Sequence, residues 1–250
     1  MNTFPRLIDP SNIPDVLTDE IRRRLGAVAV ATLTHQLQQR GLRNSFLSGL
    51  GPTHPELRLV GRARTLRYVA RREDASGRLD LGERTAQKQA VETIEPGDVL
   101  VIEARGIPDA GTIGDIFALR LQARGGAGVV TDGALRDTAA IREIELPVYH
   151  RGSHGSTFSR HHMAYSVDDA ISCAEVYVEA GDVVVGDAEG VVVIPHALVA
   201  EVARDAVAQE EVEEFAVERV RAGEPTDGLF PLADHRRAEF EAWRAGRSDD

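Results

Sequence analysis

The strongest constraint on the fold is a short apolar segment that ends in a turn. Residues Ala127 to Thr131 are apolar or β-branched, two glycines precede them, and Asp132-Gly133 follows. This pattern predicts a buried strand that stops at a turn. In open α/β sheets, ligands bind in the crevice beyond the carboxyl ends of the strands. The residues just past this strand, which include Arg136 and Asp137, are therefore candidates for a functional site.

The residues before this strand predict a strand, a loop and a helix. Asp98 to Ala104 is a second apolar run, and Arg105 to Ile113 is the loop that leaves it. A helix is predicted from Asp115 to Arg124, since Gly125-Gly126 would end it. We expect this helix to bury Ile116, Leu119 and Ala123.

The rest of the chain alternates between predicted helices and strands, so the fold class is α/β. With 250 residues, of which 42% are hydrophobic, the chain can bury one substantial core. We place one domain over residues 1–225 and a C-terminal extension over residues 226–250. The other predicted elements are a helix from Thr18 to Gly41 with Leu25, Val28, Ala29 and Leu33 on its apolar side, a strand over Val60 to Ala70, a hairpin of Asp182 to Gly186 with Val191 to Pro195, a long acidic helix over Ala197 to Arg221, and a short helix around Arg236 to Ala245.

The candidate site consists of Asp115 and, after twenty intervening residues, Arg136-Asp137. Free N–H groups at the start of the helix would receive a carboxylate, and Gly114 would let a ligand approach the backbone. Arg136 offers a charged planar fork for a second oxygen, and Asp137 offers a hard oxygen ligand for a divalent cation. The spacing alone leaves an alternative open: Asp115 could be only a helix N-terminal acid, and Asp137 could cap a helix over Thr138 to Glu143.

At these residues the chain resembles the class II pyruvate aldolases of the 4-hydroxy-4-methyl-2-oxoglutarate and 4-carboxy-4-hydroxy-2-oxoadipate type. That family shares its fold with the RraA-like regulator of ribonuclease E activity. Its mark is an Asp, twenty residues and an Arg-Asp pair, which this chain reproduces in full. The resemblance extends over Gly61 to Tyr68, Pro96 to Ile102, Gly114 to Asp137 and Ala180 to Pro195.

The resemblance implies a single α/β/α sandwich domain of the swivelling RraA-like type, with a C-terminal helical extension, assembled as a homotrimer or a dimer of trimers. It also implies roles for residues. Arg136 would contact the pyruvate end of the substrate, Asp137 would bind Mg²⁺ or Mn²⁺ directly, and Asp115 would orient water on that ion. The backbone of Gly114, Asp115, Ile116 and Phe117 would hold the pyruvate carboxylate.

Two positions modify the pattern that the resemblance implies. Family aldolases often carry acidic residues three and six positions after the metal-binding Asp, where this chain has Ala140 and Glu143. Family members also extend an acidic residue from the C-terminal helix to the metal site of a neighbouring subunit, through water. By its distance from Ala222-Gly223, Glu213 matches that residue, although a solvated helix face would also explain the glutamates around it.

The activity implied is metal-dependent cleavage of a 4-hydroxy-2-oxoacid to pyruvate and a second carbonyl compound, with oxaloacetate decarboxylation as a side activity. Lys88, the single lysine, lies in the polar stretch Glu83 to Glu92, which argues against a Schiff-base aldolase. Two alternatives stay open: a non-catalytic binding protein like the ribonuclease regulator, and a sugar-acid lyase or hydratase that uses the same enolate chemistry.

The net charge limits the partners that we expect for this protein. A formal net charge of -11 disfavours nucleic acid and anionic membranes as partners. Met1 to Asp9 lacks a basic-then-apolar pattern, so we expect a cytoplasmic protein. Cys173 is the only cysteine and is expected to be a buried small residue.

A histidine-rich segment, His150 to His162, follows a predicted strand over Pro147 to Tyr149. Its paired histidines lack the second spaced pair of a tetrahedral zinc site. We expect these histidines to line a mobile loop over the pocket or to sit in solvent. His150 could approach the far end of the substrate. The resemblance is to a longer version of the family, with this segment and a tail segment from Phe240 to Arg244, which could accept a sugar-acid-derived oxoacid in place of an aromatic-degradation product.

Overall fold

The computed structural model describes residues 16–79 and 85–247, and its largest sheet is organised around one long strand. That strand, β2 (Leu59–Ala70), pairs in parallel with β3 (Asp98–Glu103). β5 (Gly128–Thr131) and β7 (Val148–His150) continue the sheet in parallel. The predicted strands at residues 60–70, 98–104 and 127–131 are therefore confirmed, with ends that differ by at most one residue.

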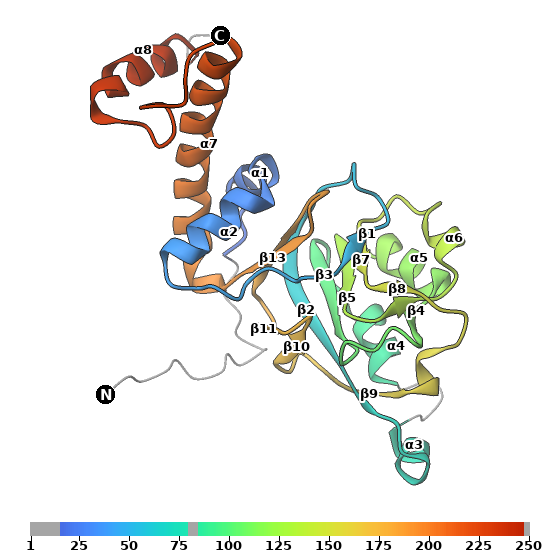
Figure 1. Cartoon of the computed structure of the whole chain (residues 1–250). Helices are drawn as coiled ribbons and strands as arrows, with labels where there is room; N and C mark the ends of the chain where they lie inside the picture. The colour runs from blue at the N-terminus through green and yellow to red at the C-terminus, as the bar shows by residue number, and fades with distance from the viewer. Residues whose placement is uncertain (1–15, 80–84, 248–250) are drawn as a thin grey trace, which may run out of the picture.

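Antiparallel strands complete the eight-stranded sheet on the other side of β2. The start of β2 pairs with β12 (Val183–Gly186), which forms the predicted hairpin with β13 (Val191–Ile194). The end of β2 pairs instead with β9 (His162–Val167). Because one strand changes its partner along its length, the sheet curls around the core (Figure 1). At the far edge β1 (Gly51–Pro52) pairs with β7.

Helices and a small hairpin cover the two faces of the sheet. On one face lie α4 (Ala86–Glu92), α5 (Asp115–Ala123) and α6 (Thr138–Ile141), which share an apolar cluster with β2, β3 and β5. On the other face β10 (Ile171–Cys173) and β11 (Val176–Val178) form a hairpin over the sheet. Cys173 is buried there, as predicted. α3 (Glu73–Leu79) follows β2.

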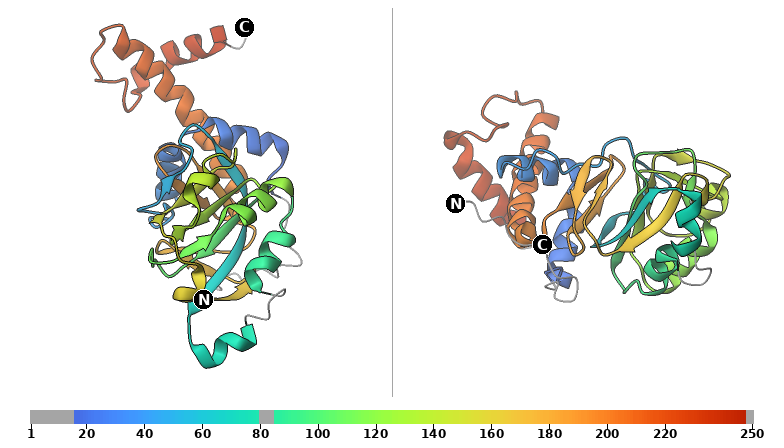
Figure 2. Two further views of the ribbon diagram at one scale, coloured as in Figure 1. Left: turned by 90° about the vertical axis from the view of Figure 1, so that its right-hand side faces the viewer. Right: turned by 90° about the horizontal axis from the view of Figure 1, so that it is seen from below.

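The N- and C-terminal helices pack together against the β12–β13 hairpin. α1 (Asp19–Ala27), α2 (Val30–Gln39) and α7 (Val199–Arg221) share an apolar cluster with these strands. α8 (Arg237–Arg247) folds back onto the end of α7, where Phe215 meets the rings of Phe240 and Trp243 edge-on and those two rings stack on each other. Figure 2 shows these C-terminal helices projecting from the body of the sheet. The α/β sandwich with a C-terminal helical extension is confirmed; the boundary at residue 225 stays a prediction.

The prediction of a single helix from Thr18 to Gly41 is wrong, because the helix is interrupted at Val28-Ala29. Thr18 does cap α1, accepting from the Ile21 amide at 3.3 Å. The break follows from tertiary polar contacts: the Ala29 amide donates to Glu210 Oε1 at 2.9 Å, and the Val30 amide donates to Asp187 Oδ2 at 2.9 Å. These carboxylates satisfy N–H groups that a continuous helix would have bonded internally.

Glu210 also corrects the expectation that the glutamates of the long helix are only solvated. Its Oε1 accepts from Thr32 Oγ1 at 2.8 Å as well as from the Ala29 amide, so it joins α7 to α2. The long helix itself is confirmed, beginning at Val199 after a 3-10 turn, η4 (His196–Leu198).

The prediction for the apolar side of α5 is wrong. Ile116 and Leu119 are 74% and 55% exposed, and Ala123 is exposed as well. The residues that α5 buries are Ala118 and Leu121. The helix is apolar on more than one side, so periodicity alone could not tell which side meets the sheet.

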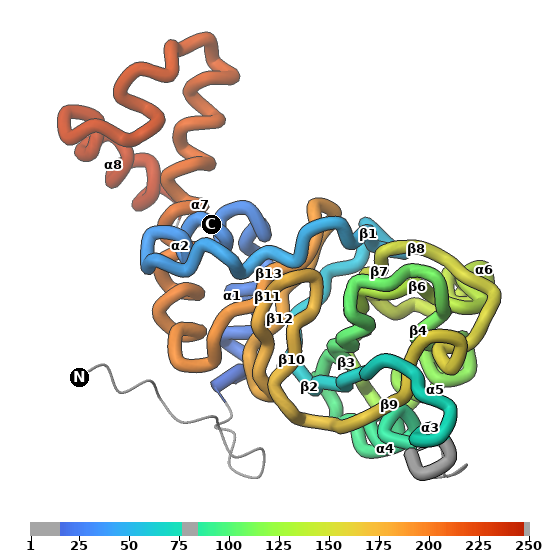
Figure 3. Tube along the Cα trace, turned by 60° about the horizontal axis from the view of Figure 1, so that its bottom comes forward, coloured from blue at the N-terminus to red at the C-terminus, as the bar shows by residue number. Residues whose placement is uncertain are grey.

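A second, three-stranded sheet lies beside α5. It contains β4 (Gly111–Ile113), β6 (Ala134–Leu135) and β8 (Gly152–Ser153), all parallel. Figure 3 shows these strands near α5 and α6 and away from α7 and α8. This small sheet brings the start of α5 and the Arg136-Asp137 pair to one edge of the molecule.

Candidate functional site

Backbone pairing sets the position of Arg136 against the start of α5. The Arg136 amide donates to the Ile113 carbonyl at 3.0 Å. A Cβ at Gly111 would lie 2.6 Å from Arg136 Cβ and 2.8 Å from Arg136 N, so only glycine permits this approach. Two segments separated by twenty residues in the sequence can therefore approach each other because Gly111 has no side chain. The backbone hydrogen bond from Arg136 to Ile113 holds them in contact.

The start of α5 offers unbonded amides. Gly114 is the N-cap residue and supplies no side chain to accept from the first turn. Asp115 Oδ1 accepts from the Ile116 amide at 2.8 Å. The amides of Asp115 and Phe117 have no acceptor among residues 16–79 and 85–247. Such orphan donors, at the positive end of a helix dipole, favour a carboxylate ligand.

Arg136 and Asp137 form a half-exposed pair beside these amides. Arg136 Nε donates to Asp137 Oδ2 at 2.9 Å, and the two side chains are 38% and 39% exposed. Asp137 has φ 57°, in the left-handed region that non-glycine residues seldom adopt. Its side chain makes no capping bond to α6, so the capping alternative is not supported. A Cβ on Gly114 would lie 3.3 Å from Asp137 Oδ2, which shows how closely the pair packs on the helix start.

A cavity of about 220 Å³ opens at this junction. All five predicted substrate-binding residues, Gly114, Asp115, Ile116, Phe117 and Arg136, line it. Further lining residues that sequence reasoning missed are Gln87 from α4 and Thr157 and Phe158 from the segment after β8. Gln87 belongs to no motif, and only the fold brings α4 and residues 157–158 to the cavity.

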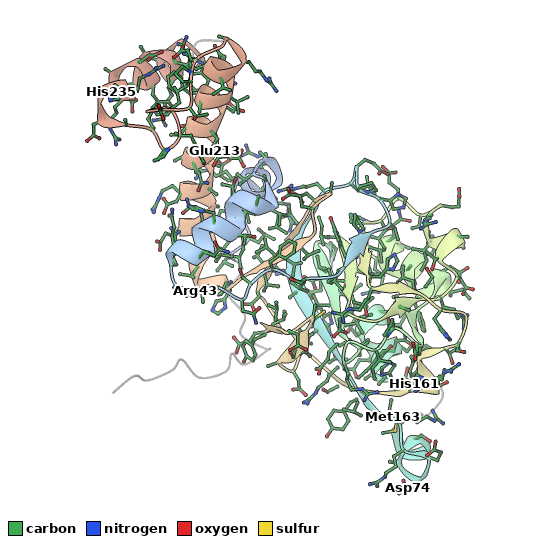
Figure 4. The ribbon with its side chains drawn as sticks, viewed as in Figure 1. Arg43, Asp74, His161, Met163, Glu213 and His235 are labelled. Atoms are coloured by element: carbon green, nitrogen blue, oxygen red, sulfur yellow. The ribbon has the colours of Figure 1, made fainter. Side chains whose placement is uncertain are left out.

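Glu213 does not join this site within one chain. It lies on α7, on the other side of the sheet from α5 (Figure 4). Gln209 Nε2 donates to Glu213 Oε1 at 2.7 Å. A contribution of Glu213 to another subunit's site stays a prediction.

The histidine-rich segment is only partly as expected. Its residues Thr157 and Phe158 do reach the cavity, but His162 is fully buried in β9 and not in a loop or solvent. Its ring stacks on Tyr68 with centroids 5.6 Å apart, and burial lowers the pKa of His162 to about 4. His150 is half-buried, and its Nδ1 lies 2.8 Å from the Gly152 carbonyl oxygen. His150 is not among the residues that line the cavity.

One other group in the described part of the chain has the spacing of metal ligands. Ligand atoms of Glu179, Asp182 and His196 lie within 4.8 Å of one another. The Asp182 carboxylate accepts from the backbone amides of Glu179 and His196, at 3.0 and 3.2 Å. Burial raises the pKa of Asp182 to about 6. These bonds explain Asp182 as the residue that closes the turn before β12.

The fold and the site define an α/β protein in which a helix start, Arg136 and Asp115 line one cavity, and Asp137 pairs with Arg136 beside it. The family profile described as RraA-like, Aldolase/RraA, matches residues 27–193, so this chain belongs to the RraA-like family. Within residues 16–79 and 85–247, no helix has the length and apolar character needed to cross a membrane.

Individual relatives differ in what their names describe. A Halalkalibacterium halodurans protein named "Putative 4-hydroxy-4-methyl-2-oxoglutarate aldolase" is 33% identical over 155 residues, covering 62% of this chain and 68% of that one. The crystal structure of Streptomyces coelicolor RraAS2 is titled as "an unusual member of the RNase ES inhibitor RraA protein family". It matches with a TM-score of 0.74 and 33% identity, covering 80% of this chain and 96% of that one.

An uncharacterized protein from Pseudomonas syringae pv. tomato also has this fold. Its structure matches with a TM-score of 0.73 and 24% identity, and the match covers 85% of this chain and 98% of that chain. At this identity the likeness shows the fold alone.

Proposed function

We propose that this protein is a divalent-metal-dependent aldolase that cleaves a 4-hydroxy-2-oxoacid to pyruvate and a second carbonyl compound, and that it decarboxylates oxaloacetate as a side activity. The observation that carries the proposal is a cavity lined by the start of α5 and Arg136, with Asp137 held beside it by its pair with Arg136. A volume near 220 Å³ lies below the usual range for drug-sized ligands and suits a small oxoacid.

The substrate carboxylate would bind at the start of α5. The unbonded amides of Asp115 and Phe117 can donate to its oxygens, and the helix dipole adds to the attraction. Arg136 would donate to the 2-oxo oxygen, where negative charge accumulates as the enolate forms. Preorganised donors of this kind contribute on the order of 3 kcal/mol to transition-state stabilisation.

The carboxylates at the cavity fit Mg²⁺ or Mn²⁺. Asp137 Oδ1 and Asp115 Oδ2 accept no hydrogen bond from the described residues, so both oxygens are available. Such ions are usually held by one or two carboxylates and keep several waters. Asp137 would bind the ion directly and Asp115 would do so through water. When bound, the ion would act as a Lewis acid toward the 2-oxo group.

The chemical step breaks the C3–C4 bond of the substrate, and its electron pair remains on C3 as the pyruvate enolate. The C4 hydroxyl loses its proton and becomes the carbonyl of the second product. Asp115, whose side chain lines the cavity, would receive this proton through a water molecule. Protonation of C3 then completes pyruvate.

We also propose that the site is completed in a homotrimer or a dimer of trimers. Ile116 and Leu119 expose large apolar side chains on α5, beside the cavity. Exposed apolar groups next to a polar site favour coverage by another protein surface. Glu213, remote from the site of its own chain, would reach the site of a neighbour.

A regulator that binds a ribonuclease without catalysis is the second candidate, because RraAS2, which is 33% identical to this chain, is described as a member of the RNase ES inhibitor RraA protein family. Asp137 Oδ1, which is available to bind a divalent ion, favours the enzyme over the regulator. A sugar-acid lyase or hydratase that uses the same enolate chemistry is a third candidate.

Pyruvate release from oxaloacetate tests the proposal. We expect release only with added Mg²⁺ or Mn²⁺, abolition by EDTA, and a loss of at least about 10³-fold in Asp137→Asn. Asparagine tolerates the left-handed backbone at this position, so the loss would report the charge and not the fold. Asp109→Asn, at an exposed position in the loop before β4, is the control. Equal rates in Asp137→Asn and wild type would refute the assigned site.

A further inference from the structure

Gln87 is a buried polar residue in the cavity wall whose acceptor is unused. The residue is only 4% exposed, and it lines the cavity from α4. Its Nε2 donates to the Thr112 carbonyl at 2.6 Å. Its Oε1 accepts no hydrogen bond from the described residues. This oxygen is also not among the fully buried side-chain atoms that lack a partner, so it keeps some contact with solvent. Since Gln87 lines the cavity, a ligand bound there could donate a hydrogen bond to this oxygen.

The amide is held in one orientation. Tyr68 Oη donates to the same Thr112 carbonyl at 2.9 Å, so this acceptor is shared by two donors. Only an N–H of Gln87 can point at a carbonyl, which fixes which end of the side-chain amide is the oxygen. Tyr68 is in turn stacked on Phe158, with ring centroids 5.2 Å apart. The unused oxygen therefore belongs to a rigid wall.

The cavity is lined by few charged residues. Among the described lining residues, Arg136 is the one cation and Asp115 the one anion. Arg136 and the α5 amides are assigned to the pyruvate half of the substrate. The other side chains that line the cavity are all neutral, and they include Gln87, Thr157 and Phe158. A carboxylate placed against these groups would lose water without gaining a cation.

We propose that the half of the substrate released as the second carbonyl compound is neutral and carries a hydroxyl that donates to Gln87 Oε1. This inference rests on the proposed aldolase function and names its substrate class. The substrate would be a hydroxylated 4-hydroxy-2-oxoacid with one carboxylate. It differs from 4-hydroxy-4-methyl-2-oxoglutarate, which carries a second carboxylate in the half that would face Gln87.

A matched pair of substrates tests the charge preference. Cleavage of 4,5-dihydroxy-2-oxopentanoate releases glycolaldehyde, and cleavage of 4-hydroxy-2-oxoglutarate releases glyoxylate, so the two differ only by CH₂OH against COO⁻. With Mg²⁺ present, we expect kcat/KM for pyruvate release to favour the neutral substrate by at least about tenfold, because a site that bonds a hydroxyl disfavours an analogue lacking it. Equal values, or a preference for the carboxylate, would overturn the proposal.

Substitutions at Gln87 test the contact itself. Gln87→Leu keeps the size of the side chain but removes the acceptor, so the preference should fall to within about threefold. Gln87→Met also keeps the length of the side chain and removes the acceptor, so it should lower the preference to the same extent. Gln89→Leu is the matched control, since Gln89 is exposed on the same helix, and its preference should equal that of the wild type. An unchanged preference in both Gln87 variants would overturn the role of this residue.

A second measurement separates this proposal from the one it rests on. Exchange of the pyruvate methyl protons for deuterium, with Mg²⁺ in D₂O, reports enolate formation without any second half of the substrate. If wild-type protein exchanges these protons but lacks the substrate preference, only the Gln87 proposal fails. If it neither exchanges protons nor cleaves either substrate, both proposals fail.

Discussion

Asp132 and Asp137 stand at the two ends of the same short segment, yet the structure uses their carboxylates in opposite ways. Asp132, at the end of β5, is 2% exposed and accepts from the amides of Ala104, Gly106 and Ala174. Asp137, two residues after β6, has a side chain that is 39% exposed, and Arg136 is its one hydrogen-bond donor within residues 16–79 and 85–247. The Asp132 carboxylate therefore joins backbone segments to one another. The Asp137 carboxylate keeps one oxygen that is available to a ligand.

The comparison shows that the role of a carboxylate depends on how many of its oxygens already accept hydrogen bonds from the protein. A buried carboxylate surrounded by amides stabilises the backbone around it, since those amides would otherwise be unpaired. A half-exposed carboxylate in a left-handed backbone conformation contributes little to the fold, and such strain often marks a functional position. Substitutions should therefore separate stability from activity at the two ends of the segment.

The largest effect on stability is expected at Asp132. Asp132→Ala removes the acceptor of three amides and should lower the free energy of unfolding by about 3–5 kcal/mol. Urea denaturation measures this change, and Asp109→Ala, at an exposed loop position, should change it by less than about 0.5 kcal/mol. A loss at Asp132 no larger than that of the control would mean that the three amide bonds do not hold the loops.

The next effect is expected at Gly111, which sets the contact between the two ends of the site. In Gly111→Ala the new Cβ would meet Arg136 at 2.6 Å, so unfolding free energy should fall by about 1–3 kcal/mol. Displacement of Arg136 should also reduce kcat/KM on oxaloacetate by about 10²-fold. Gly152→Ala in β8, at the other edge of the same three-stranded sheet, is the control, because nothing lies within 4 Å of its added Cβ. Equal behaviour of the two variants would contradict the packing argument.

A third effect, a dependence of stability on pH, is expected beneath the cavity, at His162. Burial lowers the pKa of His162 to about 4, below its ordinary value of 6.5. The unfolded chain therefore binds more protons between these values, and this residue's contribution to stability is lost as the pH falls from about 6.5 to about 4. The slope is at most about 1.4 kcal/mol per pH unit. His162→Phe, which keeps an aromatic ring against Tyr68, should remove that slope.

The measurement is the difference in unfolding free energy between His162→Phe and wild type across this pH range. A difference is needed because Asp182 changes stability in the opposite sense: burial raises its pKa to about 6, so stability falls as the pH rises from about 4 to 6. His35→Phe, at an exposed position, should leave the curve unchanged. Parallel curves for His162→Phe and wild type would show that His162 is not held neutral.

Elements whose signal is local were predicted well. The β12–β13 hairpin, the Thr18 cap and the long helix after Pro195 follow from turn, cap and periodicity patterns. The contact between the start of α5 and Arg136-Asp137 was also expected, from strand ends and from resemblance to a family. Predictions failed where distant residues decide: Asp187 and Glu210 interrupt the first helix, and the sheet meets α5 on the side of Ala118 and Leu121.

The sequence by itself determined the α/β class, the family and the set of charged residues at the site, because strand periodicity, glycine turns and the Asp, Arg and Asp spacing are local properties of the chain. Only the tertiary structure decided which other side chains share the cavity with these charged residues. Gln87, Thr157 and Phe158 come from separate segments, and the unused oxygen of Gln87 is evident only when the Thr112 carbonyl is seen to hold its other end. Hydrogen-bond satisfaction depends on partners distant in the chain, which no local pattern encodes.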